Sequence, residues 1–378
     1  MHQGPEKQGY FKKTLFLINS YIELIECFMT WLNDIDPGMR RRIKGLQLII
    51  GYGIAAAISY LWADMLGIRN PEVLSSLATG FSLFGGVMEW RSTRRIAIRD
   101  LALFVLTAIL GAFTYVYLRP LLLIKAWPGP EFALVIGAFS VAYLRPFGLL
   151  AAGIGSQMYV GQLLAYSAGL TCQDRPMILL AGTIAAIAAI VPRLLSGSTE
   201  LRAVAASPLS SVSHRIQAAV ALRMGLHAGL ATLALVLLND AVNLKQSTWA
   251  ITACIYVIAS TPTETIDRVR RRILGTAIGV PLGLICVPWA MHAHVFAWII
   301  AAAVMMLYAI ALPTRYDIAC GSFAFVLVIT LAASGETSMM LLASRAWETL
   351  IGATLSLFIA VTLLPIRATL ASNHQANS

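Results

Sequence analysis

The sequence predicts an all-α, polytopic membrane protein with about 12 transmembrane helices, arranged as two parallel six-helix repeats. Of its 378 residues, 58% are apolar and only 12% are charged, and the mean hydropathy is +0.75. Soluble domains carry about 25% charged residues. Apolar runs of about 20 residues, the length that crosses a bilayer, recur along the chain, and the same order of motifs occurs twice.

The net charge of +10 is better explained by a membrane than by a nucleic acid. In inner-membrane proteins, Lys and Arg collect in cytoplasmic loops, whereas nucleic-acid-binding proteins carry them on a soluble face. With the N-terminus inside, this asymmetry predicts a bacterial inner-membrane protein with an even number of spans and both termini in the cytoplasm. All but six of the 28 basic residues then lie on the cytoplasmic side, the exceptions being Arg69, Arg119, Lys125, Arg175, Lys245 and Arg345.

Five segments make up the predicted organisation. Residues 1–39 show apolar positions at helical spacing interrupted by acids, as in an amphipathic cytoplasmic segment on the membrane surface. A first six-helix repeat (40–195), a linker (196–215), a second repeat (216–367) and a cytoplasmic tail (368–378) follow. The expected spans are roughly 45–64, 72–88, 98–118, 130–144, 147–167, 176–195, 216–238, 247–260, 273–290, 294–312, 317–333 and 346–366.

The duplication is visible in residues that recur at a constant offset. Three pairs stand about 170 residues apart: Arg145 and Arg315, Arg175 and Arg345, and Gly182 and Gly352. The loop "EWRSTRRIAIRDL" also resembles "ETIDRVRRRILG", since each has an acid followed by an arginine cluster. Each half has an even number of spans, so both copies have the same orientation. Transporters built from such repeats place their site near the midplane, between the halves.

Two repeated arginines are candidates for binding an anionic substrate. Arg175 and Arg345 begin the sixth and twelfth spans on the outer side, and a guanidinium binds a carboxylate with two parallel hydrogen bonds. The alternative is that both side chains reach the membrane interface without binding a ligand. Trp347 is a candidate for stacking on an aromatic substrate, although aromatic residues near span ends also form the interfacial belt.

Two ionisable residues inside predicted spans are candidates for carrying protons. Glu348 follows Arg345 by three residues, so that both lie on one helix face, and an ionisable group inside a span is a functional hypothesis. An ion pair with Arg345 is the alternative. His227 lies well inside the seventh span and titrates near neutral pH, but a buried histidine can equally serve packing.

Three more acids are candidates for a gate at the cytoplasmic mouth. Asp317 follows Arg315 at the start of the eleventh span, and Glu264 and Asp267 precede the arginines of "RVRRR". These acids can pair with the loop arginines when the mouth is closed. Local ion pairing at the surface, with no gating role, stays open as the alternative.

Glycines at a spacing of four residues mark one predicted helix interface. Gly275, Gly279 and Gly283 lie in the ninth span, and such a ridge of small residues lets another helix approach closely. Pro281 is expected to kink this helix. The ridge therefore indicates helix packing, with a transport hinge as the alternative.

No enzyme motif is present in the sequence. A Walker A sequence, G-x-S-x-G, H-E-x-x-H and C-x-x-C are all absent, and these are the patterns of P-loop, hydrolase, zinc-protease and dithiol sites. We therefore expect a protein that is not an enzyme, with no cofactor and no metal.

The arginine-rich loop that leads into "RRRILGTAIGVPLG" and the final span beginning "RAWETLIGATLSLFIAVTLLP" resemble the fusaric acid resistance (FUSC) family. The resemblance is greatest over residues 210–367. It implies an inner-membrane exporter of small organic acids, often aromatic carboxylic acids. Typical members also carry a cytoplasmic domain that this sequence lacks.

Three functions therefore stay open. The first is a secondary transporter, driven by protons, that exports a small organic anion. The second is a passive anion channel on the same scaffold, and the third is a membrane subunit of an efflux assembly. The expected partners are the organic anion and the lipid bilayer but no nucleic acid, with a homodimer or a periplasmic adaptor as further partners.

Overall fold

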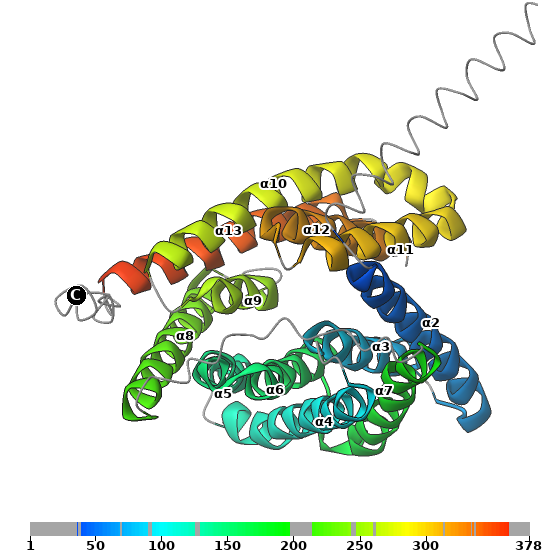
Figure 1. Ribbon diagram of the computed structural model, residues 1–378, viewed down its shortest axis with the longest axis horizontal. Helices are drawn as coiled ribbons and strands as arrows, with labels where there is room; N and C mark the ends of the chain where they lie inside the picture. Colours follow the sequence, from blue (N-terminus) through cyan, green and yellow to red (C-terminus); the bar gives the residue numbers. More distant parts are fainter. Residues whose placement is uncertain are drawn as a thin grey trace, which may run out of the picture. The chain divides into compact units, whose positions relative to one another are not determined.

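The protein is all-helical over the part of the chain that the computed structural model describes. That part comprises residues 36, 39–68, 70–89, 93–124, 129–196, 214–242, 247–259, 262–312, 314–333, 335 and 338–362. It forms 12 α-helices and three short 3₁₀ helices, with no β-strand within these ranges (Figure 1). The predicted all-α fold class is confirmed. The predicted tail and most of the predicted linker and N-terminal segment lie outside the described ranges.

Each α-helix coincides with one predicted span, although the bounds differ by several residues. The N-terminal six are α2 (Arg40–Leu66), α3 (Pro71–Met88), α4 (Arg94–Ile124), α5 (Ala133–Leu144), α6 (Leu149–Ser167) and α7 (Arg175–Leu195). The C-terminal six are α8 (His214–Val242), α9 (Ser247–Val257), α10 (Pro262–His292), α11 (His294–Ala311), α12 (Tyr316–Ala333) and α13 (Met339–Thr362). The 3₁₀ helices are η1 (Pro130–Phe132), η2 (Arg145–Phe147) and η3 (Cys172–Asp174).

Asp36 determines where the first described helix begins. Its carboxylate accepts hydrogen bonds from the backbone N–H groups of Arg41, at 3.0 and 3.1 Å, and of Arg42, at 3.0 Å. The first N–H groups of a helix have no partner within the helix, and a carboxylate at this end also complements the helix dipole. Asp36 therefore stabilises the N-terminus of α2.

Within the described ranges, six helices are long and apolar enough to cross a membrane, which indicates a multi-pass membrane protein. They cover Arg40–Leu66, Arg94–Ile124, Cys172–Leu195, Gln217–Asn239, Thr263–His292 and Tyr316–Ala333. The count of 12 transmembrane helices stays a prediction, because the other helices are shorter or less apolar.

Helices α5 and α9 are too short to cross a membrane alone. They have 12 and 11 residues, or roughly 18 and 16 Å at 1.5 Å per residue, about half of the ~30 Å hydrocarbon core. Pro146 follows the end of α5, and a proline disfavours helical backbone at the residue before it. Both helices are therefore half-length elements, shorter than the spans predicted at 130–144 and 247–260.

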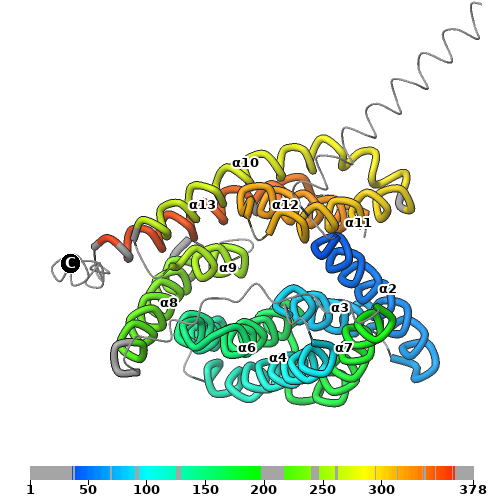
Figure 2. The backbone as a smooth tube through the Cα atoms, in the orientation of Figure 1, coloured from blue at the N-terminus to red at the C-terminus, as the bar shows by residue number. Residues whose placement is uncertain are grey.

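The helices of the two halves pack in matching pairs. In the N-terminal six, α4 packs on α6 and α7, α5 on α6, and α3 on α7. In the C-terminal six, α10 packs on α12 and α13, α11 on α12, and α9 on α13 (Figures 1 and 2). Each of these N-terminal pairs corresponds to the pair formed by the helices six places later in the chain; for example, α4 and α6 correspond to α10 and α12.

The first helix of each half also packs on the other half. Helix α8 packs along α5, where a Cβ atom on Gly225 would lie only 2.8 Å from the Phe139 ring. Helix α2 contacts α11, where a Cβ atom on Gly45 would lie 3.1 Å from the Met306 side chain. Helix α2 also packs on its own half, where a Cβ atom on Gly51 would lie 3.0 Å from the backbone oxygen of Ala188. Both first helices therefore contact both halves, and the space between the halves is enclosed by elements of both.

Glycines set the close contact between α10 and α12 of the C-terminal six. A Cβ atom on Gly275 would collide with the backbone oxygen of Asp317, and one on Gly279 would collide with that of Gly321. Gly283 faces Val328 at 2.8 Å from the same hypothetical atom. The predicted packing role of this ridge is confirmed: α10 and α12 approach at backbone distance because α10 carries no side chains there.

Candidate functional site

Two cavities lie between the N-terminal and C-terminal six helices. The larger cavity has a volume of about 960 Å³ and is lined by residues of α2, α3, α4, α6, α8, α9, α11 and α12. The second, which we call the arginine cavity, has a volume of about 500 Å³ and lies among α3, α6, α9, α10, α11 and α12. Four residues line both cavities: Phe84, Trp249, Phe323 and Leu327.

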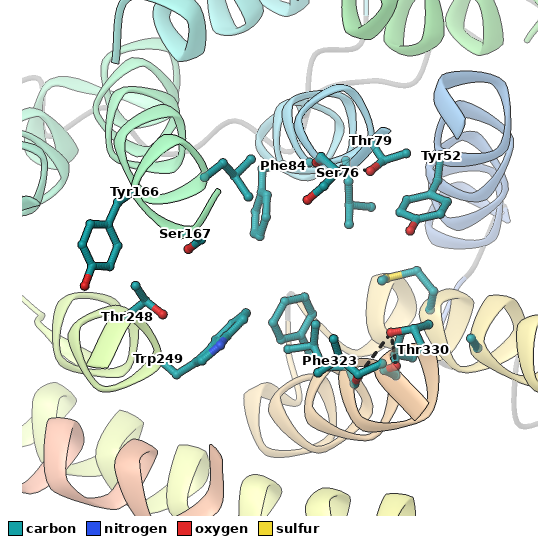
Figure 3. Close-up of a pocket in the computed structure, with 18 of the residues that line it drawn as sticks. Tyr52, Ser76, Thr79, Phe84, Tyr166, Ser167, Thr248, Trp249, Phe323 and Thr330 are labelled. Atoms are coloured by element: carbon teal, nitrogen blue, oxygen red, sulfur yellow. Dashed lines mark hydrogen bonds between the residues drawn. The ribbon is translucent and has the colours of Figure 1, made fainter. Parts of the chain in front are cut away.

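The larger cavity combines hydroxyl groups with aromatic rings (Figure 3). The Thr79 and Thr330 hydroxyls donate to carbonyl oxygens of their own helices, Ser75 O at 2.6 Å and Val326 O at 2.7 Å. A hydroxyl accepts as well as donates, so both side chains add polar atoms to the cavity wall. The cavity therefore offers weakly polar walls around an apolar volume.

Three aromatic rings form the constriction between the cavities. The Phe323 ring lies 6.4 Å from the Phe84 ring and 6.3 Å from the Trp249 ring, between ring centroids. The three side chains come from α12, α3 and α9 and converge at the centre of the close-up (Figure 3). Since these residues line both cavities, a solute that moves from one cavity to the other passes them.

Replacing Phe323 with alanine is expected to widen this constriction and to raise downhill anion flux. The truncation removes a ring that touches both neighbouring rings, and we expect a several-fold higher rate of benzoate efflux from proteoliposomes without an ion gradient. Phe296, an exposed residue of α11 outside both cavities, provides the control F296A. Equal efflux through both variants would contradict a gating role for Phe323.

The arginine cavity carries an excess of positive charge. Its described lining contains a single carboxylate, that of Asp267, and four guanidinium groups, those of Arg145, Arg268, Arg271 and Arg272. Arg271 Nε pairs with Asp267 Oδ2 at 2.8 Å, one helical turn away on α10. The other three arginines form no ion pair with a carboxylate of the described chain.

Arg145 and Arg268 place two positive charges beside one carbonyl group. Both donate to the backbone oxygen of Ile258, Arg145 at 2.6 Å and Arg268 at 3.4 Å. Arg145 lies in η2, between helices, where burial and then the charge of Arg268 lower the pKa of its guanidinium to about 10. Arg145 is thus still protonated at neutral pH. A bound anion would offset the repulsion between these two groups.

Arg272 has hydrogen-bonding capacity that the described protein does not use. Its Nη1 donates to the Tyr316 hydroxyl at 3.2 Å, while its buried Nε has no hydrogen-bond partner among the described residues. An orphaned donor of this kind usually finds water, an ion or a ligand. Tyr316 lines the same cavity.

The half-length helix α9 connects the two cavities, with opposite charges at its two ends. At its N-terminus, the Ser247 hydroxyl donates to Glu131 Oε1 at 2.8 Å, and at its C-terminal end Ile258 O accepts from the two arginines. A helix dipole favours negative charge at the N-terminus and positive charge at the C-terminus. The charges on either side of the constriction therefore both stabilise α9.

Most of the residues predicted to bind substrate or move protons lie outside these cavities. Arg175 is exposed and donates to Cys172 O at 2.7 Å and Tyr117 Oη at 3.4 Å, and Trp347 is 41% exposed on α13. Neither residue lines either cavity. Arg345 lies on α13, and its side chain is outside the described part of the structure. The roles assigned to these three residues stay predictions.

The predicted proton and gate residues are dispersed as well. Glu348 is buried in α13, and buried His227 places Nε2 3.0 Å from Ser356 O. Asp317 pairs with Arg315 at 2.9 Å, and Glu264 is exposed on α10. None of these four residues lines either cavity. Of the predicted acids, only Asp267 does, in the arginine cavity.

Sequence reasoning missed Glu131, and it gave the cavity arginines roles in membrane orientation and in ion pairs with the gate acids but not in binding an anion. Glu131 stands in "GPEF" just before an apolar run, and an acid at the start of a span was the available signal. Arg145 and the α10 arginines follow the positive-inside pattern, which concealed their convergence on one cavity.

Comparison with known proteins supports the family resemblance for part of the chain. Residues 230–359 match the sequence model of the family described as "Fusaric acid resistance protein-like". This segment includes Trp249, Phe323 and the three α10 arginines of the arginine cavity. No curated protein and no solved structure matches the chain. Together with the apolar helices, the family match indicates a membrane protein related to transport or efflux.

Proposed function

We propose that this protein is a secondary transporter that exports small organic anions, chiefly aromatic carboxylates, across the bacterial inner membrane. The observation that carries the proposal is the arginine cavity, which adjoins the larger cavity at a constriction of aromatic rings. Both volumes, about 960 and 500 Å³, lie in the range of roughly 300–1,000 Å³ typical of small-molecule sites.

The lining of the cavities suits a carboxylate attached to a ring. Guanidinium groups bind carboxylates with paired, charge-assisted hydrogen bonds, and Arg272 has a donor without a partner among the described residues. Aromatic rings prefer edge-to-face or offset contacts with other rings, and Phe84, Trp249 and Phe323 offer such contacts next to the arginines. The carboxylate would bind in the arginine cavity, with the ring directed toward the constriction.

We further propose that the two halves are parallel six-helix repeats. The matching helix pairs support this arrangement, and α2 and α8 each contact the other half. In transporters built from repeats, substrate sites lie near the midplane at the repeat interface, often beside interrupted helices. The half-length helices α5 and α9 and the cavities between the halves agree with that pattern.

The direction of transport follows from the charge distribution. The arginine cavity lies at the end that the positive-inside rule assigns to the cytoplasm, so an anion would enter there and leave through the larger cavity. A membrane potential, negative inside, drives an anion outward by about 2.3 kcal/mol per 100 mV. Antiport with an inward-moving proton adds the pH gradient to this driving force.

The test is transport of labelled benzoate into proteoliposomes that have an acidic lumen and an alkaline exterior, with the membrane potential held at zero by potassium and valinomycin. An antiporter exchanges luminal protons for external benzoate and accumulates benzoate in the acidic lumen. Passive diffusion of neutral benzoic acid does the opposite, because a weak acid collects on the alkaline side. Accumulation in the lumen, absent from protein-free liposomes, is the expected result.

A passive anion channel is the second candidate, because only side chains separate the two cavities in series. A channel would carry benzoate down its electrochemical gradient, with currents that follow voltage at any pH difference. Equilibration without accumulation in the acidic lumen would therefore favour the channel. The absence of any benzoate flux would contradict both candidates.

A further inference from the structure

We propose that Glu131 is the proton-binding site of this transporter and that its protonation loosens the contact between the two halves beside the larger cavity. The inference rests on the proposed function and adds the residue that couples protons to the anion. Glu131 lies in η1 at the start of α5, is 8% exposed and lines the larger cavity.

The carboxylate of Glu131 is held by side chains that carry no full charge. Its Oε1 accepts hydrogen bonds from the Tyr166 hydroxyl, from Ser247 Oγ at 2.8 Å and from Asn239 Nδ2 at 2.8 Å. Its Oε2 accepts from the same Asn239 nitrogen at 2.8 Å. Glu131 forms no ion pair with any basic group of the described chain.

Among the residues that the structure describes, few charged or titratable groups surround Glu131. Helix α4 contributes Tyr115 and Arg119, which line the same cavity, and α6 contributes Tyr166. Helices α8 and α9 contribute the neutral side chains of Asn239 and Ser247. Glu131 lines the larger cavity, which in the proposed orientation gives the carboxylate a route for protons from the side opposite the arginine cavity.

The hydrogen bonds of Glu131 join the two halves. Glu131 and Tyr166 belong to the N-terminal six helices, while Asn239 and Ser247 belong to α8 and α9 of the C-terminal six. An ionised carboxylate accepts all of these bonds. A protonated carboxyl has a donor of its own and fewer acceptor sites, so it cannot keep every partner. Uptake of one proton therefore weakens the contact between η1 and the N-terminus of α9.

The weakened contact lies at Ser247, the N-terminal end of α9, whereas the arginines lie at the C-terminal end of this helix. The same helix carries Trp249 of the constriction and ends at Ile258, whose carbonyl oxygen accepts from Arg145 and Arg268. A displacement of α9 after proton uptake would therefore alter both the constriction and the anion site. Proton entry and anion release are coupled through one short helix in this mechanism.

The test uses the variant E131Q in the acidic-lumen proteoliposomes, again with benzoate. We expect E131Q to lose accumulation in the acidic lumen while it retains the exchange of labelled for unlabelled benzoate at equal pH on both sides. For the wild type, accumulation on the order of tenfold per pH unit corresponds to one proton per anion. Full accumulation by E131Q would overturn the inference, and so would loss of equal-pH exchange, because the carboxylate would then serve anion binding or folding.

A second variant keeps the titratable group and changes only its surroundings. S247A removes one donor to the carboxylate, which favours the protonated form, so half-maximal accumulation should occur at a luminal pH about half a unit to one unit higher. S167A alters another serine of the larger cavity, one that forms no hydrogen bond with Glu131 in the described part of the chain, and should leave the profile unchanged. An unshifted profile for S247A would overturn the inference even if E131Q failed to fold.

Failure of the proposed function gives a different result. In that case the wild type would show neither accumulation nor exchange of benzoate. If the wild type exchanges and accumulates benzoate and E131Q does the same, the proposed transport function holds. Only the proton-binding role of Glu131 is then excluded.

Discussion

Replacement of Arg272 with glutamine should lower kcat/KM for benzoate transport by about 10- to 150-fold. A hydrogen bond to a charged group contributes about 1.5–3 kcal/mol, which converts to that range at about 1.4 kcal/mol per factor of ten. Arg272 lines the arginine cavity and has an Nε donor without a partner in the described chain. The one side-chain hydrogen bond that Arg272 forms within the described chain, from Nη1 to the Tyr316 hydroxyl at 3.2 Å, is to a neutral group, so that the loss should affect anion binding more than folding.

The measurement is the initial rate of benzoate uptake over a range of concentrations, normalised to the amount of folded protein. The matched control is R315Q, because Arg315 is exposed, pairs with Asp317 at 2.9 Å and lines neither cavity. Both variants remove one positive charge at the predicted cytoplasmic side. If R315Q lost as much activity as R272Q, the effect would come from general electrostatic attraction of anions and not from the arginine cavity.

Replacement of Gly279 with leucine should strongly destabilise the protein. The first atom of any side chain at this position would collide with the backbone oxygen of Gly321, so α10 and α12 would have to separate. Overpacking of a close contact costs about 1–3 kcal/mol and sometimes more. At the upper end of this range, the Tm in detergent should fall by roughly 4 °C.

Thermal unfolding of purified G279L in detergent checks this expectation, with G53A as control. Gly53 lies within α2, and a Cβ atom there would meet no atom within 4 Å. Replacement of glycine by alanine in a helix at a site with free space stabilises by about 0.4–1 kcal/mol, so the Tm of G53A should stay equal or rise slightly. A Tm for G279L close to that of the wild type would show that α10 and α12 tolerate a wider separation.

The helices were predictable from the sequence because burial in lipid imposes a strong local pattern. Apolar runs bounded by charges gave one segment for each of the 12 helices, and the spacing of Gly275 and Gly279 correctly indicated a close helix contact. Lengths were less predictable. The apolar character of 247–260 continues past Val257, where α9 ends, since hydropathy measures burial and not helix termination.

The candidate site was not predictable in the same way, because it depends on contacts between distant segments. Arg145 and Arg268 share the carbonyl oxygen of Ile258 although 123 residues separate them in the sequence. The positive-inside rule placed both residues in cytoplasmic loops. This rule predicts the side of the membrane on which a residue lies and does not predict which other residues it contacts. Glu131 likewise gains its significance from Asn239 and Ser247, more than 100 residues away.

The length and the packing partners of α9 have a consequence for how the protein is made. Its 11 residues are too few for independent insertion into a bilayer as a stable transmembrane segment. Its main packing partner is α13, whose Gly352 approaches the backbone oxygen of Ala250 closely, and α13 is the last described helix to leave the ribosome. The central element of the transport path therefore reaches its final position only after synthesis of the C-terminal helix. Truncation before residue 339 should consequently leave an inserted but incompletely folded chain, which the membrane quality-control proteases of the cell would degrade.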